Sequence, residues 1–174
     1  MEIRLAGSGG QGIILCSIIL ADAALMSGAY SAQSQSYGPE ARGGACKAEV
    51  VISNEKIDFP KVVKSDFMLA LTQTSLEKYL SGAKPGSILM VDSSLDLPAA
   101  VNEMGLTVHK LPILSAARDS LKRPMVANIV AVGAINACLK LVDNDILEKA
   151  VLNNVPAGTE ELNRFAMVLG STML

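Results

Sequence analysis

A short glycine-rich stretch near the amino terminus has the residue types and spacing of a phosphate-binding turn. It runs RLAGSGGQGIILC over residues 4–16, and Gly7, Gly9 and Gly12 stand in the spacing G-x-G-x-x-G. An apolar run precedes the glycines and another follows them, as in a strand–turn–helix unit. Glycine permits a tight turn, and the first turn of a helix offers unpaired N–H groups and a partial positive charge. The chemistry predicted here is the binding of an anion, above all a phosphate.

A dinucleotide site needs a second element that this stretch lacks. Such a site places Asp or Glu at the end of the second strand, roughly 20 residues after the glycines, where it binds the ribose. Here that region is YSAQSQSY, which has no arginine for a 2′-phosphate, and the first acid after Asp22 is Glu40. Two interpretations stay open: a phosphate contact without a nicotinamide cofactor, or a turn whose glycines only let the helix pack on the sheet.

A second segment, QSYGPEARGGACKAEVVIS, is more distinctive than the glycine-rich stretch. Arg42 has the planar fork that suits phosphate or carboxylate, and Tyr37 can stack and donate a hydrogen bond. Gly43 and Gly44 would let the backbone come close to a ligand or partner. Alternatively, Glu40 and Arg42 belong to a solvated loop tip. Two such loops at one end of a parallel sheet would form a crevice beyond the carboxyl ends of the strands.

Hydrophobic patterning predicts an α/β fold with one Rossmann-like, doubly wound domain over residues 1–174. We expect a mainly parallel sheet with helices on both faces, because strand-like and helix-like segments alternate. The expected strands are 2–6, 29–33, 45–53, 66–72, 88–93 and 106–113, with 57–60 considered as a short return strand. The expected helices are 11–27, a short one within 74–86 with Thr74 or Ser75 as N-cap, 97–105, 124–142, 143–153, and 160–169 with Thr159 as N-cap.

Two of the expected helices, 11–27 and 124–142, are unusually apolar. The helix at 11–27 has Asp22 as its sole charge, which indicates burial on all sides, in the core or at an interface. In the later helix, Ala127, Ala131 and Ala134 form a stripe of small residues that permits close packing against a sheet or another helix.

Composition excludes several classes of function. Half of the 174 residues are apolar, 18% are charged, and the net charge is −2. No basic block appears, so we expect no nucleic-acid partner. The start, MEIRLAG, lacks the features of a signal peptide, and polar residues interrupt every long apolar run, so we expect no membrane span and a cytoplasmic location.

The cysteines and the single histidine do not form a reactive or metal-binding pattern. Cys16, Cys46 and Cys138 lie far apart without a C-x-x-C pair, and free, mostly buried thiols are expected. His109 has no evident partner for a triad or a metal site. We therefore predict no catalytic residue and no metal ligand on this chain.

Three motifs together resemble a known family. GSGGQG at 7–12, SYGPEARGG at 36–44 and RPMVANIVAVGA at 123–134 are similar to the γ subunits of 2-oxoacid:ferredoxin (acceptor) oxidoreductases. The resemblance covers essentially the whole chain in order and is greatest to the 2-oxoglutarate type. It implies a subunit of a complex that converts a 2-oxoacid and coenzyme A into an acyl-CoA and carbon dioxide while reducing ferredoxin.

The resemblance also implies how the parts of that complex are divided among its chains. Thiamine diphosphate and magnesium would lie on the α and β subunits, and [4Fe-4S] clusters on other chains, including a ferredoxin-like δ subunit. This chain would hold no cofactor alone and would help to shape the coenzyme A side of the site. It has no thiamine-binding G-D-G pattern with a following N-N pair and no cysteine ladder, in agreement with that division.

Matching motifs let us transfer candidate binding residues to this chain. Lys122 and Arg123 could also meet a phosphate, although a solvated helix end is the more ordinary role for them. A stand-alone nucleotide-binding oxidoreductase and a purely structural interface subunit remain as alternatives. The candidate residues are Gly7, Ser8, Gly9, Gly10, Gln11 and Gly12 in the first loop and Tyr37, Glu40, Arg42, Gly43 and Gly44 in the second.

Overall fold

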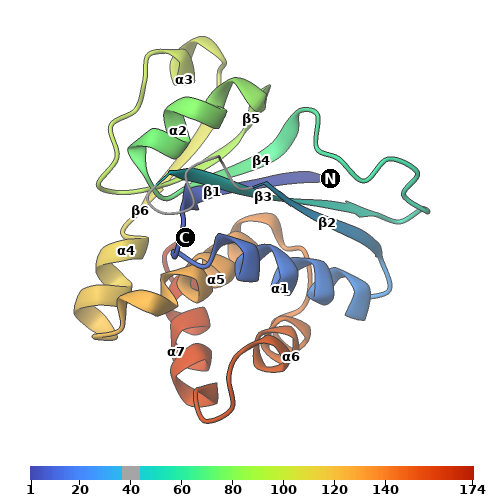
Figure 1. The fold of residues 1–174 in the computed structure, drawn as a ribbon, viewed down its shortest axis with the longest axis vertical. Helices are drawn as coiled ribbons and strands as arrows, with labels where there is room; N and C mark the ends of the chain where they lie inside the picture. The colour runs from blue at the N-terminus through green and yellow to red at the C-terminus, as the bar shows by residue number, and fades with distance from the viewer. Residues whose placement is uncertain (37–43) are drawn as a thin grey trace.

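A computed structural model describes residues 1–36 and 44–174, and over these residues the chain forms a six-stranded sheet (Figure 1). The strand order is β2-β3-β1-β4-β5-β6. The strands are β1 (Glu2–Ser8), β2 (Tyr30–Ser36), β3 (Ala45–Ser53), β4 (Ser65–Ala70), β5 (Ala83–Asp92) and β6 (Thr107–Leu111).

The sheet is mainly parallel, as the sequence predicts. Strands β1, β4, β5 and β6 run parallel to one another, whereas β3 is antiparallel to both β1 and β2. The central strands β1 and β4 are mainly apolar and bury side chains on both faces, because helices cover both sides of the sheet.

Helices cover both faces of the sheet (Figure 1). Helices α1, α5, α6 and α7 form a thick layer on one face, whereas α2 and α3 lie on the other. This arrangement confirms the predicted α/β fold with helices on both faces. The helices are α1 (Ile13–Met26), α2 (Gln73–Tyr79), α3 (Ala100–Glu103), α4 (Ile113–Ser115), α5 (Ala127–Leu139), α6 (Asn144–Asn154) and α7 (Glu160–Ser171), with short turns at Leu80–Gly82, Ala116–Ser120 and Pro124–Val126.

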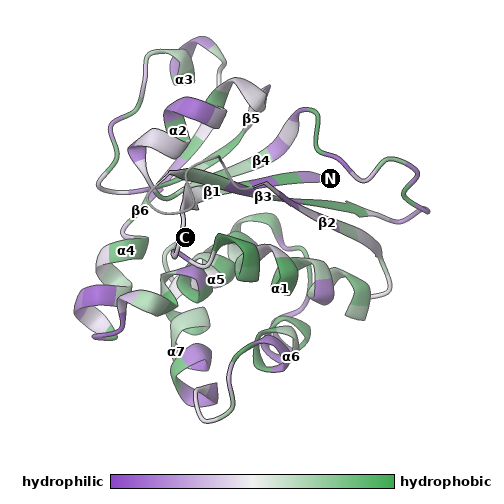
Figure 2. Ribbon diagram, in the orientation of Figure 1, coloured by the Kyte–Doolittle hydropathy of each residue, from purple (hydrophilic) through white to green (hydrophobic). Residues whose placement is uncertain are grey.

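Alternate side chains of the central strands enter two separate cores. Phe67 and Leu69 of β4 join the large core with α1 and α5, whereas Met68 and Ala70 join a smaller core with α2 and α3. Figure 2 shows the corresponding colours: α1 and α5 are hydrophobic along nearly their whole length, and α2 has a hydrophilic outer turn. The sheet is therefore the shared wall of both cores.

Several predicted boundaries differ from the structure. Strand β2 continues to Ser36, three residues beyond its predicted end, because its backbone pairs with β3 over its full length. Residues 57–60 form no strand. Pro85 and Gly86 were expected to form a turn before the next strand, but they lie inside β5, where Gly86 has a positive φ angle. Helix α2 begins earlier than predicted, and Thr72 is its N-cap through a hydrogen bond from the Ser75 N–H.

Two glycines on different helices set the packing of α5 against α7. A Cβ added at Gly133 would overlap the Met167 carbonyl oxygen, and one added at Gly170 would overlap the Val130 carbonyl oxygen. The two backbones therefore touch at this crossing. Close packing was expected from the alanine stripe of α5, and Ala131 and Ala134 are indeed fully buried, but glycine makes the closest contact.

Candidate functional site

The glycine loop (residues 7–12) joins the carboxyl end of β1 to the amino end of α1. The Ser8 N–H donates to the Gln11 side-chain Oε1 at 2.7 Å, and the Gln11 N–H donates to the Ser8 carbonyl oxygen at 3.2 Å. Gln11 thus closes the turn with its own side chain, so that its amide oxygen is already engaged in the loop.

Two different constraints, close packing and a positive φ angle, favour glycine at positions in this loop. A Cβ at Gly7 would come within 2.6 Å of Gln11 Oε1, and one at Gly12 within 2.5 Å of Asn128 Nδ2, so both make room for packed side chains. Gly12 also has a φ of 72°, and Gly10 has a φ of 93°. Gly10 differs because, among the described residues, no atom lies within 4 Å of its missing Cβ.

The amino end of α1 is left with unpaired N–H groups. Gly12 is the N-cap residue, no side chain among the described residues caps the helix, and its first turn contains no acid. The first backbone bond of the helix runs from the Cys16 N–H to the Gly12 carbonyl oxygen at 2.9 Å. The N–H groups before it and the helix dipole therefore favour an anion at this end.

Three hollows meet at Gly10. The smallest, about 270 Å³, lies between the glycine loop and Cys46 of β3. The second, about 320 Å³, is lined by Gln11, Arg118 and Met125. The third, about 470 Å³, is mainly apolar, and its walls include Arg123, Asn128 and residues from the start of α7. Together they give the loop the concave surroundings that a ligand of moderate size requires.

Two arginines lie at the rim of these hollows. Arg118 lines the second hollow and is exposed, and its guanidinium forms a pair of 2.8 Å hydrogen bonds with the Asp119 carboxylate. These bonds raise the pKa of Arg118 and lower the pKa of Asp119. Arg123, a sequence candidate, lines the third hollow and is exposed. Arg118 was not predicted, because only the fold brings residue 118 beside residues 10 and 11.

The cysteines near the loop are poor nucleophiles. Cys46 lines the smallest hollow, and burial raises its thiol pKa. Cys16 is fully buried in α1, where burial raises its pKa to about 12. The structure also groups no three His, Cys, Asp or Glu residues into a possible metal site within the part it describes. The site can therefore bind and orient a ligand through backbone N–H groups and arginines.

The second predicted loop falls largely outside the described residues. Tyr37, Glu40, Arg42 and Gly43 lie there, and their part in the site stays a prediction. Gly44 is described, and it directly precedes β3. Ala45 pairs with Ser8 and Cys46 with Gly7 in the antiparallel register, so the start of β3 lies beside the glycine loop. The fold thus brings one end of the second loop to the first.

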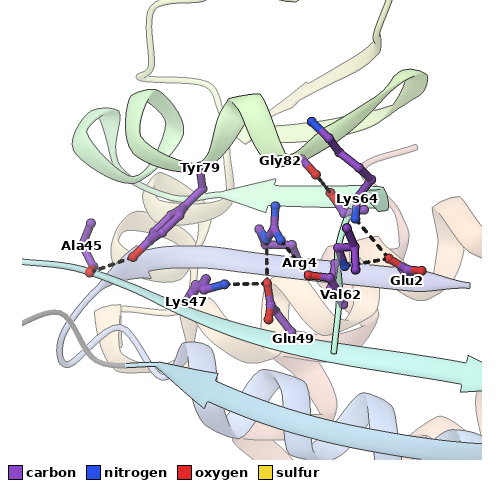
Figure 3. Close-up of polar contacts among 11 residues, drawn as sticks. Glu2, Arg4, Ala45, Lys47, Glu49, Val62, Lys64, Tyr79 and Gly82 are labelled. Carbon is purple, nitrogen blue, oxygen red and sulfur yellow. Dashed lines mark hydrogen bonds and ion pairs between the residues drawn. The ribbon is translucent and has the colours of Figure 1, made fainter. Parts of the chain in front are cut away.

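A buried ion pair that the sequence analysis missed supports this region from the opposite face of the sheet (Figure 3). Arg4 Nε and Lys47 Nζ each lie 2.8 Å from Glu49 Oε1, and both Arg4 and Glu49 are over 90% buried. Gly82 leaves space for the Arg4 guanidinium, and the Tyr79 hydroxyl donates to the Ala45 carbonyl oxygen at 3.2 Å.

One sequence signal could have located this pair. Arg4 and Glu49 are charges inside strand-like, mainly apolar runs, where a buried charge needs a partner.

The comparisons with known proteins agree on one family. A family model described as pyruvate ferredoxin/flavodoxin oxidoreductase matches residues 2–172. The chain is 48% identical over 170 residues to the 2-oxoglutarate synthase subunit KorC of Methanocaldococcus jannaschii, covering 97% of this chain and 91% of that relative. No helix within residues 1–36 and 44–174 has the length and apolar character needed to cross a membrane.

Two solved structures of oxoacid ferredoxin oxidoreductases also match the fold of this chain. The γ subunit of a keto/oxoacid ferredoxin oxidoreductase from Geobacter sulfurreducens matches with a TM-score of 0.87 and 43% identity, covering 99% of this chain and 96% of that one. The 2-oxoglutarate:ferredoxin oxidoreductase of Magnetococcus marinus, solved with 2-oxoglutarate, coenzyme A and succinyl-CoA bound, matches with a TM-score of 0.88 and 24% identity. That match covers 99% of this chain but 30% of the other, and it establishes a shared fold.

Proposed function

The chain belongs to the pyruvate ferredoxin/flavodoxin oxidoreductase family and is a γ-type subunit of a 2-oxoacid:ferredoxin oxidoreductase, and we propose that it forms part of the coenzyme A side of that enzyme's site. Residues 1–174 act as one accessory domain, with no catalytic residue of their own. The likeness to a 2-oxoglutarate synthase subunit supports 2-oxoglutarate as the substrate.

The meeting of three hollows at Gly10 is the observation that carries this proposal. Coenzyme A combines phosphate groups with a long, mainly apolar arm that ends in a thiol. Unpaired N–H groups of α1, together with Arg118 and Arg123 at the rim, suit the phosphates. The mainly apolar hollow of about 470 Å³ suits part of the arm.

Other chains would supply the redox and thiamine chemistry. Thiamine diphosphate with magnesium on the α and β subunits would support decarboxylation of the 2-oxoacid, with ferredoxin as the final electron acceptor. This chain holds the coenzyme so that its thiol can accept the acyl group, and it contacts those subunits and a ferredoxin-like δ subunit. We expect the assembled enzyme in the cytoplasm.

Substitutions in the reconstituted complex test the coenzyme A role. Arg118→Ala and Arg42→Ala should each raise KM for coenzyme A several-fold while leaving KM for the 2-oxoacid nearly unchanged, because the proposal places these arginines at the phosphates of the coenzyme and away from the 2-oxoacid. Arg164→Ala is the matched control, since Arg164 is a half-exposed arginine paired with Glu148 on the helical layer. Equal effects on both Michaelis constants, or none, would remove the coenzyme A role.

Co-purification tests the assembly itself. A tagged chain expressed in its host should retain thiamine-containing partner subunits. Recovery without any of them would contradict the subunit role.

A purely structural role is supported for two of the glycines. The side chains of Gln11 and Ile13 pack against Gly7, and that of Asn128 packs against Gly12. Substituting either glycine should therefore disturb packing whether or not a ligand binds. The dinucleotide alternative loses support because β2, Tyr30–Ser36, contains no acid for a ribose. Micromolar binding of NADH or FAD by the purified chain would revive it.

A further inference from the structure

The buried asparagines of the described chain differ in how fully their side chains are hydrogen-bonded. Asn128, Asn136 and Asn163 each have only 4 or 5% of their surface exposed. Asn136 uses both ends of its amide within the chain: Nδ2 donates to the Val142 carbonyl oxygen at 3.0 Å, and Oδ1 accepts from the Val142 N–H at 3.1 Å. These bonds hold the turn after α5, so Asn136 has a structural role.

In Asn128 and Asn163, by contrast, only the amide nitrogen is engaged. Asn128 Nδ2 donates to the Gly12 carbonyl oxygen at 3.4 Å, and Asn163 Nδ2 donates to the Thr159 carbonyl oxygen and Oγ1, both at 2.9 Å. No described residue donates a hydrogen bond to either Oδ1 atom. In the described chain, Ser87 Oγ is the sole side-chain polar atom that is both sealed from solvent and unpaired, so the two Oδ1 atoms are accessible.

Both of these asparagines line the third hollow at the glycine loop, which is mainly apolar and has a volume of about 470 Å³. Because the chain holds their nitrogens, Oδ1 is the polar atom that each amide has left for the hollow. An acceptor on an apolar wall is costly unless a donor meets it, and in ligand sites a few such groups fix the orientation of the ligand. The two oxygens therefore indicate a ligand whose apolar chain carries N–H or O–H donors.

The packing of the helices fixes where these two oxygens lie. Asn128 is near the start of α5 and Asn163 is in the first half of α7, and the two helices touch further along at Gly133 and Gly170. Backbone contact at that crossing sets the distance between the helices. The bond from Asn128 to Gly12 ties the same region to the glycine loop. The acceptors are thus preorganised relative to each other and to the loop.

We propose that Asn128 and Asn163 accept hydrogen bonds from the pantetheine arm of coenzyme A, an inference that rests on the coenzyme A role proposed above. The arm carries two amide N–H groups and a hydroxyl along a mainly apolar chain, so its donors match acceptors on an apolar wall. The phosphates are bound outside this hollow, by the amino end of α1 and by Arg118. Asn128 and Asn163 therefore position the arm, and through it the thiol that accepts the acyl group.

Pantetheine, which lacks the nucleotide and all the phosphates, separates the two parts of the site. In the reconstituted complex, Asn128→Leu and Asn163→Leu should each lower kcat/KM about 2- to 10-fold with coenzyme A and with pantetheine alike, as expected for one lost hydrogen bond. Arg118→Ala should lower kcat/KM with coenzyme A and leave the value for pantetheine unchanged. Asn136→Leu is the matched control, since Asn136 is equally buried but does not line this hollow, and it should change neither value.

The same set of variants distinguishes a failure of this inference from a failure of the coenzyme A role. If Arg118→Ala impairs the use of coenzyme A but Asn128→Leu and Asn163→Leu do not, their oxygens bind only water, and the inference is wrong while the coenzyme A role stands. If none of the three substitutions changes kcat/KM for coenzyme A, both are wrong.

Nuclear magnetic resonance tests the contact without any substitution. In the ¹⁵N-labelled native chain, pantetheine should shift the side-chain amide signals of Asn128 and Asn163, because a bond to Oδ1 changes the whole amide group. The signal of Asn136, whose amide is already satisfied, should stay in place. Unshifted signals of Asn128 and Asn163, or an equal shift of Asn136, would overturn the proposal.

Discussion

The α5–α7 crossing and the glycine loop are both built on glycine, yet they use it in opposite ways. At the crossing, Gly133 and Gly170 let two helix backbones touch, and any side chain there would overlap a carbonyl oxygen. In the loop, Gly10 has a positive φ, and no atom of the described residues lies within 4 Å of its missing Cβ. The first use closes a core and the second leaves a surface free for a ligand.

Gly12 lies between these extremes. It combines a φ of 72° with a close neighbour in Asn128, so it contributes both to the turn and to packing. The surroundings of a glycine, more than its motif, therefore determine which property a substitution will change. Substitutions at these positions therefore separate stability from binding.

Gly170→Ala should have the largest effect on stability. The new methyl group must push α5 and α7 apart, which we expect to lower the free energy of unfolding by about 3 kcal/mol. Denaturant unfolding of the purified chain measures it. Val168→Ala on the exposed side of α7 is the control and should change stability by less than about 0.5 kcal/mol. Equal effects of the two would show that the crossing is not tightly packed.

Gly12→Ala should have an intermediate effect. A left-handed conformation costs an alanine about 1–2 kcal/mol, and contact with Asn128 adds to that cost. Adding Asn128→Ala should relieve the contact but not the backbone strain, so the two substitutions should be non-additive in a double-mutant cycle. Strict additivity would contradict a contact between these residues.

Gly10→Ala should have the smallest effect on stability of the three glycines. Only backbone strain of about 1 kcal/mol is expected, because no neighbour among the described residues meets the methyl group. In the complex, however, KM for coenzyme A should rise several-fold at unchanged KM for the 2-oxoacid. A loss of stability as large as that of Gly170→Ala would break the distinction between the two regions.

Thiol labelling compares the closed core with the open loop without a stability measurement. At about pH 8, the half-buried Cys138 should react first with maleimide and Cys46, in the wall of a hollow, more slowly. Cys16 should react only on unfolding, because burial raises its pKa to about 12 and excludes the reagent. Peptide mass spectrometry follows each site, and early labelling of Cys16 would show that the core opens in the native state.

Several features could be predicted from the sequence because each depends on residues that are close together in the chain. The glycine spacing predicted a strand-to-helix turn, continuous apolar runs predicted buried parallel strands, and motif order indicated the family. The predicted helix start at residue 11 lies two residues before the observed start of α1 at Ile13, since the long apolar run and its glycine boundaries are local features.

The candidate site needed the tertiary structure. Gly12 meets Asn128, 116 residues away, and Arg4 meets Glu49 across two strands. Arg118 reaches the glycine loop only because α4 and the turn after it follow β6 at the same end of the sheet. Backbone conformation and burial pattern are set by adjacent residues, whereas these contacts depend on how layers pack, which no short stretch of sequence specifies.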